Sequence, residues 1–175
     1  MPTLVSTLGL TPEVVTELVD LLLKRGTAIK KVVVVCTQGA LVSYYALAID
    51  FKYGYYHGGI PLEVAPLPVD DIRSEDDCRI FRRTMVDAIR QEEDVIIGIS
   101  GGRKTMPVDA VLIAMALGVE DVYYVMAKER PGADKRFRAV AELYNLKLYA
   151  EGIEKPPEEL LRTLQDILHP TDVTV

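Results

Sequence analysis

Asp94-Val-Ile-Ile-Gly-Ile-Ser100-Gly-Gly-Arg-Lys-Thr-Met106 joins an apolar run, a glycine-rich basic turn and the start of a second apolar run. Residues 95–99 predict a buried strand, and residues 107–117 predict a helix. Gly101 and Gly102 have no Cβ, so the backbone can approach a ligand closely. Arg103 and Lys104 add positive charge, and the following helix directs its free N–H groups to the same place. The turn therefore favours an anion, above all phosphate; the alternative is an ordinary βα turn with two solvated basic residues.

Two common nucleotide-binding loops do not fit the sequence. Gly98 is separated by four residues from Arg103-Lys104-Thr105, as in a Walker A loop whose last glycine is replaced by Arg103, so we exclude an ordinary P-loop NTPase. The first turn, Leu8-Gly-Leu-Thr-Pro-Glu13, has one glycine where the dinucleotide fingerprint has three. NAD and FAD are excluded on that ground.

Composition narrows the class of protein further. The chain has 175 residues, 49% hydrophobic and 26% charged, which fits a single folded domain over residues 1–175. Its net charge of −6 disfavours binding of long nucleic acid but allows a local pocket for one small anion. Cys36 and Cys78 form no CxxC motif and no histidine cluster accompanies them, so we expect two buried thiols, no metal and no cofactor. With no signal-peptide pattern and no run approaching 18 apolar residues, we expect a soluble, cytoplasmic protein without a membrane segment.

Strand and helix patterns alternate along the chain. We predict strands over residues 4–8, 31–36, 61–69, 95–99 and 122–127, and helices over residues 12–25, 40–51, 75–91, 107–117 and 133–144. This alternation predicts an α/β fold with a doubly wound, parallel, Rossmann-like sheet in strand order 3-2-1-4-5. A short strand over residues 146–149 and a helix over residues 156–168 belong to an extension, residues 128–175, of a core formed by residues 1–127.

The predicted strand order places the candidate site. The first and fourth strands become neighbours, so the turn Gly9-Leu10-Thr11 meets residues 100–106 at the carboxyl edge where the strand order reverses. Gln38 and Gly39, after the second strand, would form one wall of this crevice. Ligands of doubly wound sheets bind at such a point.

Two segments taken together resemble the CARF domains of CRISPR systems. They are residues 7–17, Thr-Leu-Gly-Leu-Thr-Pro-Glu-Val-Val-Thr-Glu, and Ser100-Gly-Gly-Arg-Lys-Thr-Met106. Within that group it resembles the stand-alone ring nucleases that degrade cyclic tetra-adenylate, and the resemblance covers roughly residues 1–127. It implies a homodimer whose two crevices join across a two-fold axis into one pocket for the cyclic ligand. The apolar helix over residues 107–117 is the candidate interface. The alternative is an ordinary buried crossover helix.

The resemblance also implies the chemistry and the site residues. A ribose 2′-hydroxyl would attack the adjacent phosphodiester without a metal, leaving linear di-adenylate with a 2′,3′-cyclic phosphate and switching off type III CRISPR signalling. Lys104 would stabilise the developing charge, and Thr11, by its match to the family's motif, would orient the 2′-hydroxyl. Thr11 has an alternative role as a helix N-cap, and Arg103 either binds phosphate or pairs with a surface acid. Thr105 and Met106 would start the helix and line the pocket.

The two histidines lie outside these turns. His57 belongs to residues 53–59, a stretch rich in tyrosine and glycine that we expect to be a mobile loop; it would act as a lid or simply lie in an exposed turn. His169, beside Pro170, is interpreted as incidental. Two rival functions remain: a non-catalytic sensor of cyclic oligoadenylate that acts through a partner protein, and an unrelated α/β nucleotide-binding protein.

Overall fold

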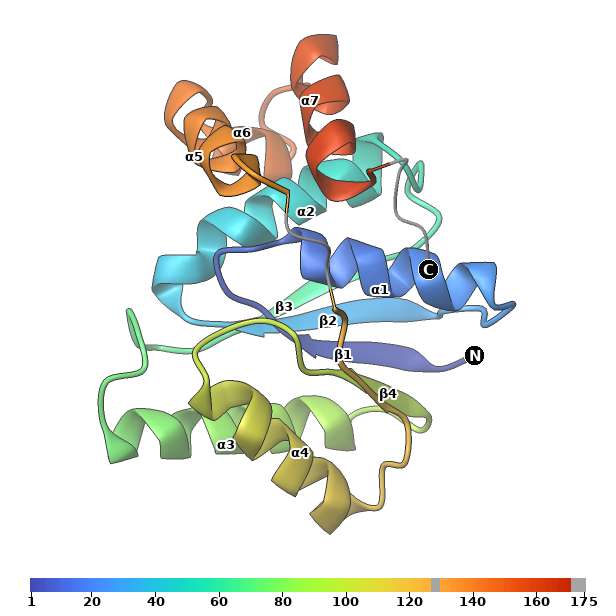
Figure 1. The fold of residues 1–175 in the computed structure, drawn as a ribbon, viewed down its shortest axis with the longest axis vertical. Coiled ribbons are helices and arrows are strands. Elements are labelled where there is room, and N and C mark those ends of the chain that lie inside the picture. Colours follow the sequence, from blue (N-terminus) through green and yellow to red (C-terminus); the bar gives the residue numbers. More distant parts are fainter. Residues whose placement is uncertain (127–129, 171–175) are drawn as a thin grey trace.

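The computed structural model describes residues 1–126 and 130–170 (Figure 1). Five parallel strands form one sheet in the order β3-β2-β1-β4-β5, which confirms the predicted order. The strands are β1 (Thr3–Thr7), β2 (Lys31–Cys36), β3 (Leu62–Pro66), β4 (Val95–Gly98) and β5 (Val122–Tyr123). Every residue of β1 and β4 is buried because both faces of the sheet are covered. β3, with Pro66 at its end, forms an edge as its prolines predicted.

Helices cover both faces of the sheet (Figure 1). One face carries α1 (Glu13–Lys24) and α2 (Leu41–Tyr53), which follows the short 3-10 helix η1 (Gln38–Ala40). The other face carries α3 (Glu75–Arg90) and α4 (Thr105–Leu117). The chain then crosses back, and α5 (Ala133–Leu143), α6 (Leu146–Ala150) and α7 (Glu158–Leu168) form an outer layer over α1 and α2. None of the helices described here is both long and apolar enough to span a membrane.

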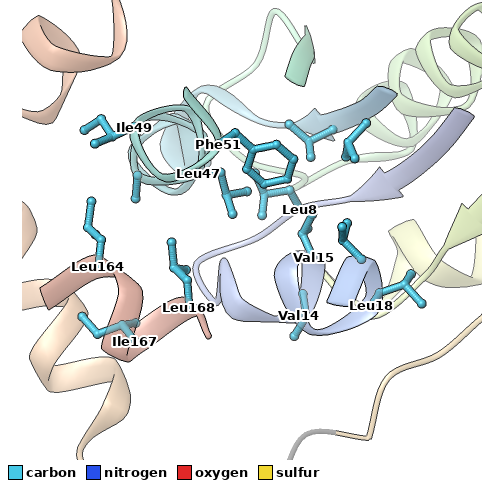
Figure 2. Packing of buried hydrophobic residues seen from close by; sticks show 14 of the residues in the cluster. Leu8, Val14, Val15, Leu18, Leu47, Ile49, Phe51, Leu164, Ile167 and Leu168 are labelled. Carbon is cyan, nitrogen blue, oxygen red and sulfur yellow. The ribbon is translucent and has the colours of Figure 1, made fainter. Parts of the chain in front are cut away.

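The outer layer extends the larger of two hydrophobic cores. Leu164, Ile167 and Leu168 of α7 are buried with Leu47 of α2 and Val15 of α1 in one continuous cluster (Figure 2). Each of these side chains is at most 3% exposed. The predicted C-terminal extension therefore shares a core with the sheet instead of forming a separate unit.

The prediction of a strand over residues 146–149 is wrong, because these residues form α6. Leu146 and Leu148 flank Lys147, an alternation typical of a strand. The segment packs against α2, however, where no strand is available for pairing. Its backbone hydrogen bonds therefore close locally, from Leu148 N to Asn145 O and from Glu151 N to Lys147 O.

Helix α4 has two apolar faces. Met106, Ala110 and Ile113 are buried against the sheet. On the opposite side Val108, Leu112 and Met115 are 60%, 58% and 74% exposed, and their spacing of four and three residues puts them on one stripe. A continuous apolar stripe in contact with water requires a cover, which the predicted interface would supply.

Only one of the two predicted buried thiols is fully buried. Cys36, at the end of β2, is inaccessible to solvent, and this burial raises the pKa of its thiol to about 12. Cys78 on α3 is half-buried.

The interpretation of His169 as incidental is wrong. Its ring is buried, with Nδ1 2.6 Å from Oδ2 of Asp20 on α1 and Nε2 2.6 Å from Oδ2 of Asp50 on α2. Tyr56 donates a hydrogen bond to the other oxygen of Asp20, and the Tyr55 ring stacks on the imidazole at a centroid distance of 4.1 Å. Within the stretch predicted to be a mobile loop, Tyr55 and Tyr56 thus pack on the His169 ring, whereas His57, Gly58 and Gly59 are exposed.

Two carboxylates make the buried imidazole a cation. Burial alone lowers the pKa of His169, but the hydrogen bonds to Asp20 and Asp50 outweigh it and raise that pKa to about 9. Asp50 is 1% exposed, and its Oδ1 has no partner among the described residues. The ion pair with His169 therefore compensates the burial of this carboxylate.

We predict that His169→Gln lowers the free energy of unfolding by about 2–3 kcal/mol at pH 6 and by much less at pH 10. The pKa is higher in the folded protein than the ordinary 6.5, so the stabilisation is complete below pH 6.5 and disappears as the pH rises through about 9. Urea unfolding of both proteins between pH 6 and 10 measures the difference. The matched control is His57→Asn, because His57 is exposed and asparagine tolerates its φ of 49°. A wild-type-to-variant difference that does not change with pH would contradict the assignment.

Candidate functional site

A cavity of about 370 Å³ lies at the carboxyl edge of the sheet, where the strand order reverses. It lies between the turns that follow β1, β2, β3 and β4. Its lining includes nine of the residues that the sequence predicted: Gly9, Leu10, Thr11, Gly39, Ser100, Gly101, Gly102, Arg103 and Met106.

Strand register brings the first and fourth turns together. β1 pairs with β4 with Ser6 opposite Gly98, so both strands end side by side. Ser100 lies at the start of the fourth turn, and its Oγ accepts a hydrogen bond from Val125 N at 2.6 Å. Val125, two residues after β5, is thereby tied to the crevice.

The glycines allow backbone to approach backbone. A Cβ on Gly9 would lie 2.7 Å from Gly102 N, and a Cβ on Gly101 would lie 2.6 Å from Thr7 O. Both distances are too short for any residue with a side chain. We predicted close approach to a ligand; the structure adds that the two turns touch each other through these glycines.

Gly102 is required for a second reason. Its φ of +87° lies in the left-handed region, which favours glycine. A Cβ there would also lie 2.7 Å from Sδ of Met106, whose side chain is buried under the turn. Met106 thus supports the turn from below and lines the cavity, as predicted.

Thr11 lines the cavity with an exposed side chain. Helix α1 begins after Pro12, and no side-chain cap is formed there. Val14 N instead bonds to the backbone carbonyl of Thr11, at 3.3 Å. The Thr11 hydroxyl therefore does not cap α1, and it forms no hydrogen bond with another residue of 1–126 or 130–170.

Lys104 and Thr105 lie at the start of α4, next to the cavity but outside its lining. Both side chains are exposed. The Lys104 ammonium forms no hydrogen bond or ion pair with any residue in 1–126 or 130–170. A cation that is not neutralised by a neighbour is well suited to bind an anion.

Arg103 pairs with an acid that sequence reasoning missed. Its Nε and Nη2 atoms donate to Oδ1 and Oδ2 of Asp71 at 2.9 and 2.5 Å. The hydrogen bond from Arg103, with a second from Ile72 N, lowers the pKa of Asp71 to about 2. Asp70, Asp71 and Arg73 line the cavity after β3. The predicted topology could have pointed to these residues, because β3 ends at the same edge of the sheet as β1 and β4.

Besides Lys104 and Thr105, two more predicted site residues, Gln38 and His57, lie outside the cavity lining. Gln38 donates through Nε2 to Leu67 O and through its backbone N to Val69 O, so it holds the wall together from outside the lining. His57 follows the carboxyl end of α2, whereas the cavity lies at the amino end of that helix. Within one chain His57 lies at the opposite edge of the sheet.

A second cavity, of about 400 Å³, lies at the amino edge between residues 89–95 and 117–121. Its charged lining is mainly acidic, with Glu92, Glu93, Asp94, Glu120 and Asp121 against Arg90. Such a lining disfavours an anion. Across the described part of the chain, no three His, Cys, Asp or Glu side chains are grouped closely enough to hold a metal ion.

We predict that Gly9→Ala lowers the free energy of unfolding by about 1–3 kcal/mol, because the new methyl group overlaps the Gly102 backbone. Leu10→Ala is the matched control: Leu10 is 65% exposed, and its truncation should change stability by less than about 0.5 kcal/mol. Urea denaturation measures both. Equal stability of the Gly9 variant and the wild type would show that the turns do not touch.

Comparison with known proteins shows the family of the chain. The sequence profile of the family described as CRISPR-associated protein NE0113 matches residues 11–165. A CRISPR system ring nuclease of Saccharolobus solfataricus is 30% identical in an alignment 156 residues long that covers 84% of each chain. Csm6 of Enterococcus italicus, solved with cyclic hexa-2′-fluoro-hexa-dAMP, has the same fold with a TM-score of 0.50 and 13% identity; the match covers 95% of this chain and 44% of that one. Can2 of Sulfobacillus thermosulfidooxidans, solved with cyclic tetra-adenylate, gives a TM-score of 0.49 and 12% identity over 95% of this chain and 63% of that one.

The profile match and the relative at 30% identity confirm the resemblance to CRISPR-associated ring nucleases, and the chain belongs to the CRISPR-associated protein NE0113 family.

Proposed function

We propose that the protein binds cyclic tetra-adenylate in its carboxyl-edge cavity and cleaves it to linear di-adenylate with a 2′,3′-cyclic phosphate, which would switch off type III CRISPR signalling. The observation that carries the proposal is the position of the Thr11 hydroxyl and the Lys104 ammonium beside one crevice built from glycines, neither group being paired with any residue that the structure describes. The relative that is 30% identical is named a ring nuclease, which supports the same activity here.

The reaction is a transesterification within the ligand. The ribose 2′-oxygen forms a bond to phosphorus while the bond from phosphorus to the 5′-oxygen breaks, and the proton lost by the 2′-hydroxyl ends on that 5′-oxygen. Thr11 orients the 2′-hydroxyl, and Lys104 stabilises the negative charge that develops on the phosphate oxygens. Two such cuts release two di-adenylates, and no water is consumed.

Metal independence belongs to the proposal. Nucleophile and phosphate are both part of the ligand, so the protein has to supply only orientation and positive charge. In the turn after β4, Lys104 supplies the net positive charge, and Arg103, which is paired with Asp71, supplies further N–H donors.

A homodimer is the second part of the proposal. The cavity of one chain, about 370 Å³, is at the lower end of the range for small-molecule sites, and a ring of four nucleotides needs more room. The exposed stripe Val108, Leu112 and Met115 lies on α4, directly after the turn that carries Lys104. Pairing two copies through this stripe would cover it and place two cavities around one two-fold symmetric ligand.

Incubation of the pure protein with cyclic tetra-adenylate in EDTA tests the activity, with products separated by chromatography and identified by mass spectrometry. We predict di-adenylate ending in 2′,3′-cyclic phosphate, and a loss of about 100- to 1,000-fold in rate for Lys104→Ala. Lys24→Ala, at the exposed end of α1, is the matched control and should cleave at the wild-type rate.

Other outcomes of this experiment discriminate between the functions. Tight binding without cleavage would make the protein a sensor that needs a partner. Equal binding of ATP would indicate an unrelated nucleotide-binding protein. Full activity of Lys104→Ala would contradict the role given to that lysine.

We predict that Leu112→Glu converts a dimer into a monomer, because the carboxylate would be buried at the interface without a partner. Light scattering after size exclusion measures the mass. Leu143→Glu, which places the same charge at a 76% exposed leucine of α5, should remain dimeric. A monomeric wild type, or a dimeric Leu112 variant, would rule out this interface.

A further inference from the structure

The ion pair between Asp71 and Arg103 connects turns that belong to distant strands. Asp71 follows β3, at the edge of the sheet, and Arg103 follows β4. Two strands, β2 and β1, lie between β3 and β4 in the sheet order. At about 4.8 Å per strand, the pair reaches over the carboxyl ends of both, across the crevice.

Asp71 is the fixed partner of this pair. Gln38 N and Gly39 N donate to the carbonyls of Val69 and Asp70, which anchors the backbone just before Asp71 to the turn after β2. Ile72 N donates to Oδ1 of Asp71 at 2.8 Å, and the side chain is only 19% exposed. Arg103 is 66% exposed and depends on Asp71 for its position.

The pairing leaves one edge of the guanidinium available. A guanidinium has five N–H donors. Asp71 takes the Nε donor and one donor of Nη2, so the two donors of Nη1 and the second of Nη2 remain. Of these three, one N–H of Nη1 and the remaining N–H of Nη2 form the end-on fork that can bind two oxygens of a phosphate.

We propose that Asp71 is a positioning residue for the cleavage reaction: it holds Arg103 across the crevice so that the free edge of the guanidinium meets the scissile phosphate. The inference rests on the proposed function. Arg103 then contributes directed hydrogen bonds, while Lys104, which no acid of the described residues neutralises, contributes the net charge.

The proposal predicts that a substitution of Asp71 has different effects on ligand affinity and on the cleavage rate. In Asp71→Asn the carboxylate charge is lost and Arg103 becomes an uncompensated cation, so an anionic ligand binds as tightly as before or more tightly. The orientation of the guanidinium is lost at the same time, which lowers the rate of the chemical step. A residue that merely tied two turns together would instead weaken both stability and binding.

The test compares Asp71→Asn, Arg103→Ala and the double variant. Single-turnover cleavage of cyclic tetra-adenylate gives the rate, and titration with its non-cleavable 2′-deoxy analogue gives the affinity. We expect each single variant to lose roughly 10- to 100-fold in rate, and the double variant to be no slower than Arg103→Ala. Asp71→Asn should keep the wild-type melting temperature and bind the analogue at least as tightly as the wild type. Asp71→Glu, which retains a carboxylate, should recover part of the rate.

Asp76→Asn is the matched control, since it removes one acid from the exposed first turn of α3 outside the cavity lining. It should leave rate and affinity unchanged. Wild-type cleavage by Asp71→Asn, or a further loss of rate when it is added to Arg103→Ala, overturns the positioning role. If the proposed function itself is wrong, the result differs from these outcomes, because the wild-type protein then leaves cyclic tetra-adenylate intact.

Discussion

The contact between the backbones of Gly9 and Gly102 is the constraint on which the rest of the site depends. Neither turn can carry a side chain there, since a Cβ on Gly9 would lie 2.7 Å from Gly102 N. Thr11 follows Gly9 by two residues and Lys104 follows Gly102 by two. Packing glycine against glycine therefore fixes the backbones of the two turns that carry Thr11 and Lys104 relative to each other. Catalysis by orientation needs such rigidity, because small displacements of reacting groups cost large factors in rate.

The outer helical layer also supports the site, and it does so through helix α1. Helix α1, whose first turn follows Thr11, is held by α7 through the hydrogen bond from the Thr16 hydroxyl to Leu168 O at 2.6 Å. The ion pair of His169 with Asp20 fixes the carboxyl half of α1, and Arg130 pairs with Glu17 between them at 2.8 Å. Residues of the outer layer thus hold the helix that directly follows Thr11. None of residues 130–170 lines the cavity.

The features that could be predicted correctly from the sequence are those that short-range patterns determine. Apolar runs and glycine positions were sufficient for the strand order, and the order was sufficient to bring residues 9–11 and 100–106 to one crevice. Pairings between distant residues were missed, as in the ion pair of His169 with Asp20, 149 residues apart, and that of Asp71 with Arg103, 32 apart. No local pattern marks such partners. The strand predicted over residues 146–149 failed for a similar reason, because alternation does not reveal whether a neighbouring strand exists.

A crystal structure of the protein with non-cleavable 2′-deoxy cyclic tetra-adenylate tests the central claim most directly. The account predicts one ring shared by two chains, with a phosphate oxygen about 3 Å from Nζ of Lys104 and a ribose 2′-carbon beside the Thr11 hydroxyl. A ring bound away from the turns at residues 9–11 and 100–106, or a single chain that holds the whole ring, would contradict it.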